Sequence, residues 1–310
     1  MTKIELENFK CFKERTAFPL SKLTLLTGTN GGGKSTILQS LLLMRQSIEH
    51  NDATDHILLN GKCINLNKFN DIRNTHNSRN EPIRFIYHYN QTVISYDLKE
   101  SQSKNFLNVN GSAEYFLTEN IEDDMVIKIE AIEFYDLLEL SLSDEDKYES
   151  LSYKIHSIYS SNYNSLLRKI MFNYTIFTSN DENSEAQLQG ISTINNLIPS
   201  GSFLKFNNSE IELDSTLLHL SLNFGHIHYI SADRLGPQEF YLKSTLNKFP
   251  NVGSRGEFTV NLLYKKRDYL VNEKLCLGQD AKTLYTQTEE WLNEIFNGAK
   301  VEIPSSDSNS

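Results

Sequence analysis

The chain has 310 residues and a formal net charge of −10, from 30 Lys and Arg against 40 Asp and Glu. This balance excludes a generally basic surface of the kind that binds nucleic acid, although a local basic patch stays open. Three cysteines exclude a complete disulfide framework, and no apolar run reaches the roughly 18 residues of a spanning helix. We therefore expect a cytoplasmic protein without a membrane partner.

The pattern of the first 50 residues predicts three strands and a helix. Residues 2–9 alternate apolar and charged side chains, as a half-buried strand does, and a second strand is predicted at residues 16–20. Residues 23–27 form a short apolar run that is typical of a buried parallel strand. Residues 37–48 carry apolar side chains at helical spacing.

Between the third strand and the helix lies a glycine-rich loop, residues 28–36, which reads G-T-N-G-G-G-K-S-T and fits G-x-x-x-x-G-K-[ST]. Glycines let the chain wrap a phosphate with its N–H groups inward, and the helix directs its positive end at the same anion. Lys34 is expected to reach the β- and γ-phosphates of ATP, and Ser35 to hold Mg²⁺. The predicted nucleotide-binding residues of the loop are Asn30, Gly31, Gly32, Gly33, Lys34, Ser35 and Thr36. The alternative, a glycine-rich turn that binds nothing, does not account for the flanking strand and helix.

The opening of the chain, I-E-L-E-N-F-K-C-F at residues 4–12 followed by the glycine-rich loop, resembles ABC-type ATPase heads of the SMC, RecF and OLD group. The resemblance covers residues 3–48; Gly32 stands where the group usually has Ser. It implies an α/β fold, that of a P-loop NTPase with an ABC-type head: a mixed parallel core sheet, an antiparallel side sheet and a helical insertion. It also implies that Lys10 approaches the nucleotide or the opposite head; the alternative is a solvated lysine at a strand end.

The middle of the chain predicts more strands and then a change of character. Residues 83–98 alternate as a hairpin with a turn at Asn90 and Gln91, and residues 125–129 predict another strand. Residues 141–222, rich in Ser, Asn and Tyr, indicate helical pieces joined by loops. We therefore expect an ATPase core at 1–140, a helical polar insertion at 141–222, a return to the core at 223–300 and a disordered tail at 301–310.

Residues 227–238 predict a buried strand that ends abruptly in charge, where α/β proteins often place chemistry. A similar line, Y-I-x-A-x-R-x-G-P, occurs in the OLD-like group, and it implies a supporting or Q-loop role near the nucleotide for Asp233, Arg234 and Gln238. Of these, Asp233 and Gln238 are the catalytic candidates. The alternative is an Asp–Arg pair that closes a structural turn. Residues 254–257, S-R-G-E, imitate the signature loop of ABC heads, but no strand ending in two carboxylates comes after them.

The last predicted element is a helix at residues 283–296 with Trp291, Leu292, Ile295 and Phe296 on its buried side. In the resembling group the signature loop and the acidic strand lie beyond such a helix, which suggests an N-terminal part of an ATPase. The resemblance implies a homodimer or higher oligomer through the heads, an effector protein as partner, and a role in defence against phage. The alternatives are a nucleotide-gated scaffold that does not hydrolyse ATP and, with less support, a small-molecule kinase.

Overall fold

The computed structural model describes residues 1–50, 54, 56–78, 80–96, 104–144, 147–161, 170–178, 181–200, 203–205, 212–214, 222–236, 238, 251–278 and 282–302. The chain divides into two compact units, Met1–Ile227 and His228–Ser310. The tail expected to be disordered lies outside the described residues from position 303 onward.

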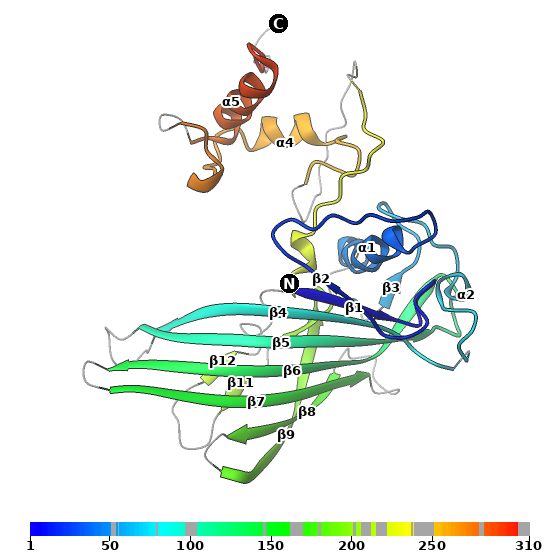
Figure 1. The fold of residues 1–310 in the computed structure, drawn as a ribbon, viewed down its shortest axis with the longest axis vertical. Coiled ribbons are helices and arrows are strands. Elements are labelled where there is room, and N and C mark those ends of the chain that lie inside the picture. Colours follow the sequence, from blue (N-terminus) through cyan, green and yellow to red (C-terminus); the bar gives the residue numbers. More distant parts are fainter. Residues whose placement is uncertain are drawn as a thin grey trace, which may run out of the picture. The chain divides into compact units, whose positions relative to one another are not determined.

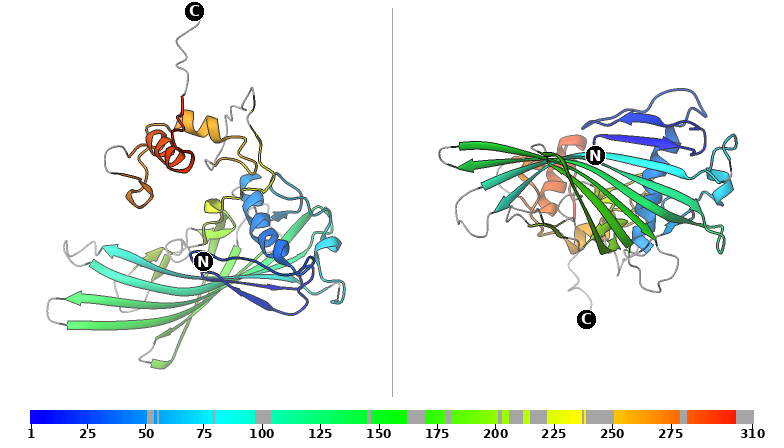
Figure 2. Two further views of the ribbon diagram at one scale, coloured as in Figure 1. Left: turned by 45° about the horizontal axis from the view of Figure 1, so that its top comes forward. Right: turned by 90° about the horizontal axis from the view of Figure 1, so that it is seen from below.

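The first unit is built on one large antiparallel sheet (Figure 1). Its strands run in the order β10-β9-β8-β7-β6-β5-β4-β1-β2, and β3 pairs with β6. The bounds are β1 Lys3–Glu7, β2 Thr16–Pro19, β3 His56–Leu58, β4 Ile83–Tyr96, β5 Lys104–Glu119, β6 Val126–Asp144, β7 Lys147–Ser161, β8 Ile170–Thr178, β9 Asp181–Asn195 and β10 Ile198–Ser200. A separate pair joins β11 Phe203–Lys205 and β12 Glu212–Asp214. The strands fan out with the twist expected of long strands (Figure 2).

One face of this sheet carries the core, because apolar side chains alternate with polar ones along β1, β4, β5 and β6. Five aromatic rings, those of Phe9, Phe85, Tyr87, Tyr115 and Phe224, follow one another in edge-to-face contacts across it. The helix α1 (Lys34–His50) covers the same face, where the Tyr87 hydroxyl donates to the Ser40 carbonyl at 3.3 Å. The short 3-10 helix η2 (Phe224–His226) contributes the last ring.

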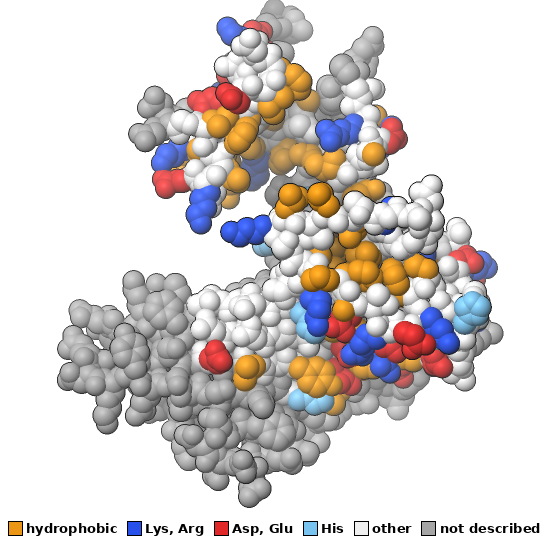
Figure 3. Space-filling model, in the orientation of Figure 1, with side chains coloured by type: hydrophobic (Ala, Val, Ile, Leu, Met, Phe, Trp, Pro, Cys, Tyr) orange, Lys and Arg blue, Asp and Glu red, His pale blue; other side chains and the backbone are white. Residues whose placement is uncertain are grey.

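The opposite face of β1, β4 and β5 carries mixed charges. Arg15 lies at the centre of these charged side chains, and its guanidinium is 2.6 Å from a Glu114 oxygen and 3.3 Å from a Glu7 oxygen. Arg84 lies 3.6 Å from the same Glu7 carboxylate. Figure 3 shows basic and acidic side chains interspersed here. Since these charges balance, the described side chains of this face form no basic patch for nucleic acid.

The expectation of helices at residues 141–222 is wrong. Residues described there form strands β7, β8 and β9, and β7 pairs with β6 from Asp144↔Lys147 to Ala131↔Ser160. The Tyr, Ile and Thr content that accompanies the Ser and Asn favours strands. The turn expected at Asn90 is also wrong, because β4 continues through it and pairs with β5 along its whole length.

The parallel core expected for an ABC-type head is not found among the described residues, where every strand pairing is antiparallel. Residues 23–27 form no strand, and Leu23 and Leu25 are 75% and 78% exposed. Residues 227–231 are likewise not a strand, and Ile230 is 54% exposed. Both predictions of buried strands are wrong because neither run has a neighbouring parallel strand in the described part of the chain.

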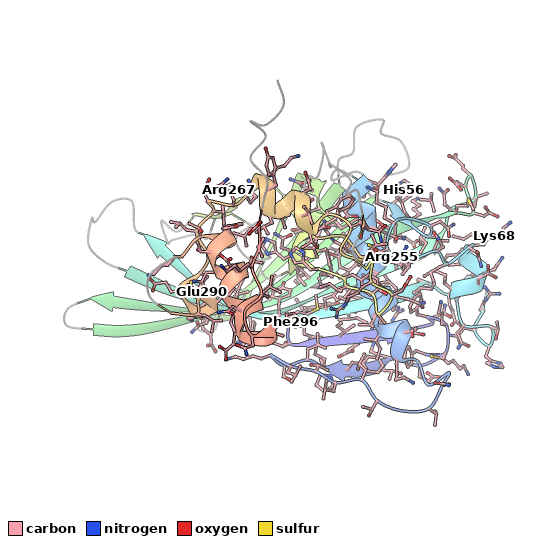
Figure 4. The ribbon with its side chains drawn as sticks, turned by 90° about the horizontal axis from the view of Figure 1, so that it is seen from above. His56, Lys68, Arg255, Arg267, Glu290 and Phe296 are labelled. Carbon is pink, nitrogen blue, oxygen red and sulfur yellow. The ribbon has the colours of Figure 1, made fainter. Side chains whose placement is uncertain are left out.

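The second unit contains helix α4 (Thr259–Lys265), the 3-10 helix η3 (Glu273–Leu275) and helix α5 (Leu284–Phe296). The Thr283 side chain accepts from the Thr286 N–H and so begins α5 as an N-cap. The predicted helix is confirmed, but its expected buried side is wrong, because Trp291, Ile295 and Phe296 are exposed. Figure 4 shows the Phe296 side chain at the end of this helix. Among the described helices of the chain, none has the length and apolar character needed to cross a bilayer.

The short helix α2 (Phe69–Ile72) completes the first unit and comes after a closed loop. In this loop the Asn60 side-chain oxygen accepts from the N–H groups of Leu66 and Asn67, and Gln46 of α1 donates to the Leu58 carbonyl at 2.7 Å. These bonds give residues 59–71 a structural role beside α1. The proposed boundaries at 140, 222 and 300 stay predictions.

Candidate functional site

The predicted glycine-rich loop lies on the surface of the first unit and leads directly into α1. Gly28, Gly31 and Gly33 have φ angles of 136°, 83° and 89°. Only glycine adopts such angles without strain, so the loop can turn its backbone inward where a side chain would forbid it. Asn30, Gly31 and Gly32 are exposed, whereas Gly33 is buried. The loop is therefore open to solvent on one side and packed on the other.

Lys34 closes over the loop that precedes it. Its ammonium donates to the Gly28 carbonyl at 2.9 Å and to the Thr29 carbonyl at 2.7 Å. These bonds use two of the three donors of the ammonium and hold its charge at the mouth of the loop. An anion at this point meets a fixed positive charge.

The first turn of α1 supplies the other groups that a phosphate site needs. The N–H groups of this turn have no acceptor within the helix, and the helix dipole favours an anion beside them. Ser35 is exposed at this end of the helix, while Thr36 is buried. The donor set therefore fits a nucleoside triphosphate: backbone N–H groups and Lys34 would hold the phosphates, and the Ser35 hydroxyl would hold Mg²⁺, whose charge neutralises the phosphate oxygens.

The packed side of the loop is covered by residues 8–13, which lie between β1 and β2 and are named the hairpin tip here. A Cβ atom at Gly33 would collide with Phe12 Cζ and would lie 2.9 Å from Cys11 Sγ. Cys11 Sγ also lies 3.9 Å from Thr36 Oγ1. The hairpin tip thus touches the loop and the first turn of α1 together.

Lys10 belongs to the same hairpin tip and turns toward α1. Its ammonium donates to Gln39 Oε1 at 2.7 Å. Burial lowers the pKa of Lys10, and the neighbouring Cys11 and Asp71 oppose the change. The solvated lysine considered as the alternative does not describe this side chain, because the charge is half-buried and bonded. Its approach to a nucleotide stays a prediction.

Asp233 and Gln238 lie in the second unit, and their expected catalytic roles stay predictions. The Asp233 carboxylate is 3.2 Å from the Arg255 guanidinium, which also donates to the Asp233 carbonyl at 3.4 Å. The Gln238 side chain donates to the Gly236 carbonyl at 3.2 Å. Asp233 thus pairs with Arg255 of the S-R-G-E stretch. This ion pair is close to the Asp–Arg pair considered as the alternative, but the arginine is Arg255 rather than Arg234.

The S-R-G-E stretch is a tight loop held by the Glu257 side chain and by residues 231–235. The Arg255 N–H donates to the Glu257 carboxylate at 2.8 Å, and the N–H groups of Ser231 and Leu235 donate to the carbonyls of Ser254 and Arg255. The sequence did not predict the pairing of these two segments, since they are about twenty residues apart and no periodic pattern links them.

One ionisable side chain lies deep in the core of the first unit and was not singled out by the sequence. Asp136 of β6 is 4% exposed, and its Oδ1 accepts from the Tyr89 hydroxyl at 2.5 Å. Burial raises the pKa of Asp136 to about 7, and the hydrogen bond from Tyr89 opposes that rise. Among the described residues, no group of three or more His, Cys, Asp or Glu side chains could hold a metal ion.

An exposed glycine-rich loop that enters a helix through Gly-Lys-Ser, with the lysine charge at its mouth, defines a P-loop protein that binds nucleoside triphosphates. A family model described as an AAA ATPase domain matches residues 1–249. The chain therefore belongs to the AAA ATPase domain family, and this membership supports ATP binding, a P-loop NTPase fold and ATPase function. No curated protein and no solved structure matches the chain.

Proposed function

We propose that the chain binds Mg-ATP through residues 28–36 and is the nucleotide-binding part of an OLD/SMC-like ATPase. The observation that carries this proposal is the geometry of the loop: three glycines at positive φ, and the Lys34 ammonium within 2.9 Å of two loop carbonyls. The family match over residues 1–249 supports the ATPase part of it. The β1–β2 hairpin and the antiparallel sheet beside α1 support the OLD/SMC-like part.

In this proposal nucleotide binding brings two copies of the head together, and hydrolysis drives an effector protein. The proposal includes a role in defence against phage, by analogy with the group that the opening residues resemble. The hydrogen-bonded position of Lys10, beside Gln39 in the first half of α1, supports a role for this side chain in head association.

The experiment compares Lys34→Ala with Lys22→Ala, a matched control that removes the same charge from an exposed position outside the loop. Mg-ATP affinity is measured by isothermal titration calorimetry, and circular dichroism checks the fold. We expect Lys34→Ala to weaken binding by about tenfold or more, because it deletes a phosphate-facing charge, while Lys22→Ala binds as the wild type does. A folded Lys34→Ala variant with undiminished affinity would refute the assignment.

Phosphate release then separates two candidate functions. Phosphoryl transfer needs a positioned water and stabilisation of charge on the γ-phosphate, beyond what the loop and Mg²⁺ supply. A chain that binds Mg-ATP and releases phosphate over many turnovers supports the ATPase. Tight binding without phosphate release supports the non-hydrolysing nucleotide-gated scaffold.

A further inference from the structure

The hairpin tip touches the glycine-rich loop at Gly33. The Phe12 ring and Cys11 Sγ occupy the space that a side chain at Gly33 would take, and Gly33 itself is buried with a φ of 89°. The preceding part of the loop, from Gly28 to Gly32, is exposed. The contact with Phe12 therefore falls on the one glycine of the loop that is packed against the body of the unit.

The hairpin tip is held in a fixed shape. Asn8 and Lys10 have φ angles of 56° and 50°, and the pair Phe9 and Phe12 exchanges two backbone hydrogen bonds of 3.0 and 2.9 Å. The Asn74 side chain, which is buried, donates to the Lys10 carbonyl at 2.7 Å. Two residues at strained angles persist only where surrounding bonds fix them.

Further hydrogen bonds tie the hairpin tip to residues that precede β4. The Lys10 N–H donates to the Ile72 carbonyl at 2.6 Å, and the Asn8 side chain donates to the Glu81 carbonyl at 2.9 Å, just before β4 begins. The Phe18 ring of β2 lies 5.1 Å from the Phe12 ring, centroid to centroid. Phe12 is thus presented to the loop by a rigid support.

We propose that Phe12 is a positioning residue of the phosphate-binding loop: its ring holds Gly33, and with it the last turn of the loop before Lys34, in the conformation that accepts phosphate. This inference rests on the proposed function, because it assigns Phe12 to the Mg-ATP site described above. Phe12 acts through Gly33. Loop and ring are matched, because glycine leaves room for the ring, and the ring, together with Cys11 Sγ, fills the space that glycine leaves.

The consequence for binding depends on conformational populations. A loop that adopts its binding-competent conformation for only a fraction of the time binds with an affinity reduced by that fraction. If removal of the ring lowers this fraction to about a tenth, the apparent Kd for Mg-ATP rises about tenfold. Replacement by leucine keeps apolar bulk against Gly33 and is expected to keep most of the affinity.

The test measures Mg-ATP affinity by isothermal titration calorimetry for Phe12→Ala, Phe12→Leu and Phe116→Ala, with thermal unfolding of each. Phe116 is a matched control, since it is a half-buried phenylalanine of the same unit that packs against Arg84 on the charged face. We expect the Kd for Mg-ATP to be about tenfold higher in Phe12→Ala and close to the wild-type value in Phe12→Leu. Phe116→Ala should lower the melting temperature about as much as Phe12→Ala does but bind Mg-ATP with wild-type affinity.

The outcomes distinguish the positioning role of Phe12 from the nucleotide site itself. Equal Kd values for Phe12→Ala and Phe116→Ala would overturn the positioning role, as would a loss of affinity in Phe12→Leu as large as in Phe12→Ala. Both results leave the nucleotide site intact as long as Lys34→Ala lowers affinity. Undiminished Mg-ATP binding in Lys34→Ala would instead refute the assignment of the nucleotide site, and the proposed role of Phe12 would fail with it.

Discussion

The replacement of Asp136 by Asn should change how the stability of the first unit depends on pH. Gly111 lies opposite both Tyr89 and Asp136 in the sheet, so the Tyr89 ring crosses the space left by the glycine and reaches the Asp136 carboxylate. The hydroxyl satisfies Oδ1, whereas Oδ2 is buried without a hydrogen-bond partner among the residues that the structure describes. A buried carboxylate with half of its acceptors unmet favours the protonated form.

The pKa sets both the size and the sign of the effect. Burial raises the pKa of Asp136 from the ordinary 3.8 to about 7. The folded protein therefore holds a proton that the unfolded chain releases, so this side chain does not oppose folding below pH 3.8 and opposes it increasingly up to about pH 7. The whole change amounts to on the order of 4 kcal/mol, since one pKa unit is worth ~1.36 kcal/mol. Asparagine cannot ionise and lacks this dependence.

Urea unfolding monitored by circular dichroism at several pH values between about 5 and 8 tests the prediction. We expect the free energy of unfolding of Asp136→Asn, relative to the wild type, to increase across this range. Asp124→Asn is the control, because the Asp124 carboxylate is half-exposed beside Lys68. Parallel pH profiles for the wild type and Asp136→Asn would refute the reasoning.

Two further substitutions test the packing around Asp136 and the role of Lys10 in the association of two heads. Gly111→Ala places a Cβ atom against Asp136 Oδ1 and 2.7 Å from Tyr89 Cε2, so it should lower the free energy of unfolding by about 1–3 kcal/mol in urea titrations. Gly236→Ala is the control and should not lower it, because a Cβ atom there meets no atom of the described residues within 4 Å. Lys10→Glu should weaken ATP-dependent association measured by light scattering more than it lowers the melting temperature; equal association with and without the substitution contradicts a role in the head contact.

Local patterns predicted the parts of the fold that depend on neighbours in the sequence. The alternation at residues 2–9, the glycine-rich loop and the apolar spacing of residues 37–48 correspond to β1, the candidate site and α1. The helix predicted at residues 283–296, which corresponds to α5, likewise rests on a local pattern. In each case the signal lies within a few residues, where propensity, capping and periodicity act.

The prediction failed where long-range pairing decides the structure. Strands β7 to β9 pair with one another over stretches that read as polar loops and helical pieces, and paired residues such as Tyr153 and Thr178 are too far apart in the sequence for a local pattern to link them. Asp136 escaped notice for a related reason: one acidic residue in an alternating strand gives no sign that its face is buried. Its partner Tyr89 lies 47 residues away.

The segment before the glycine-rich loop contributes little to holding the site in shape. Residues 23–27 carry the apolar composition of a strand buried on both faces, yet Leu23 and Leu25 are about three-quarters exposed. Burial of each leucine would contribute about 1.5–3 kcal/mol, and the described part of the chain does not provide it. The loop is consequently fixed on its other sides, by helix α1 at its C-terminal end and by the hairpin tip packed against Gly33. The Phe12 contact therefore matters more here than it would in a loop whose leading strand were paired, because it supplies the order that the preceding segment does not.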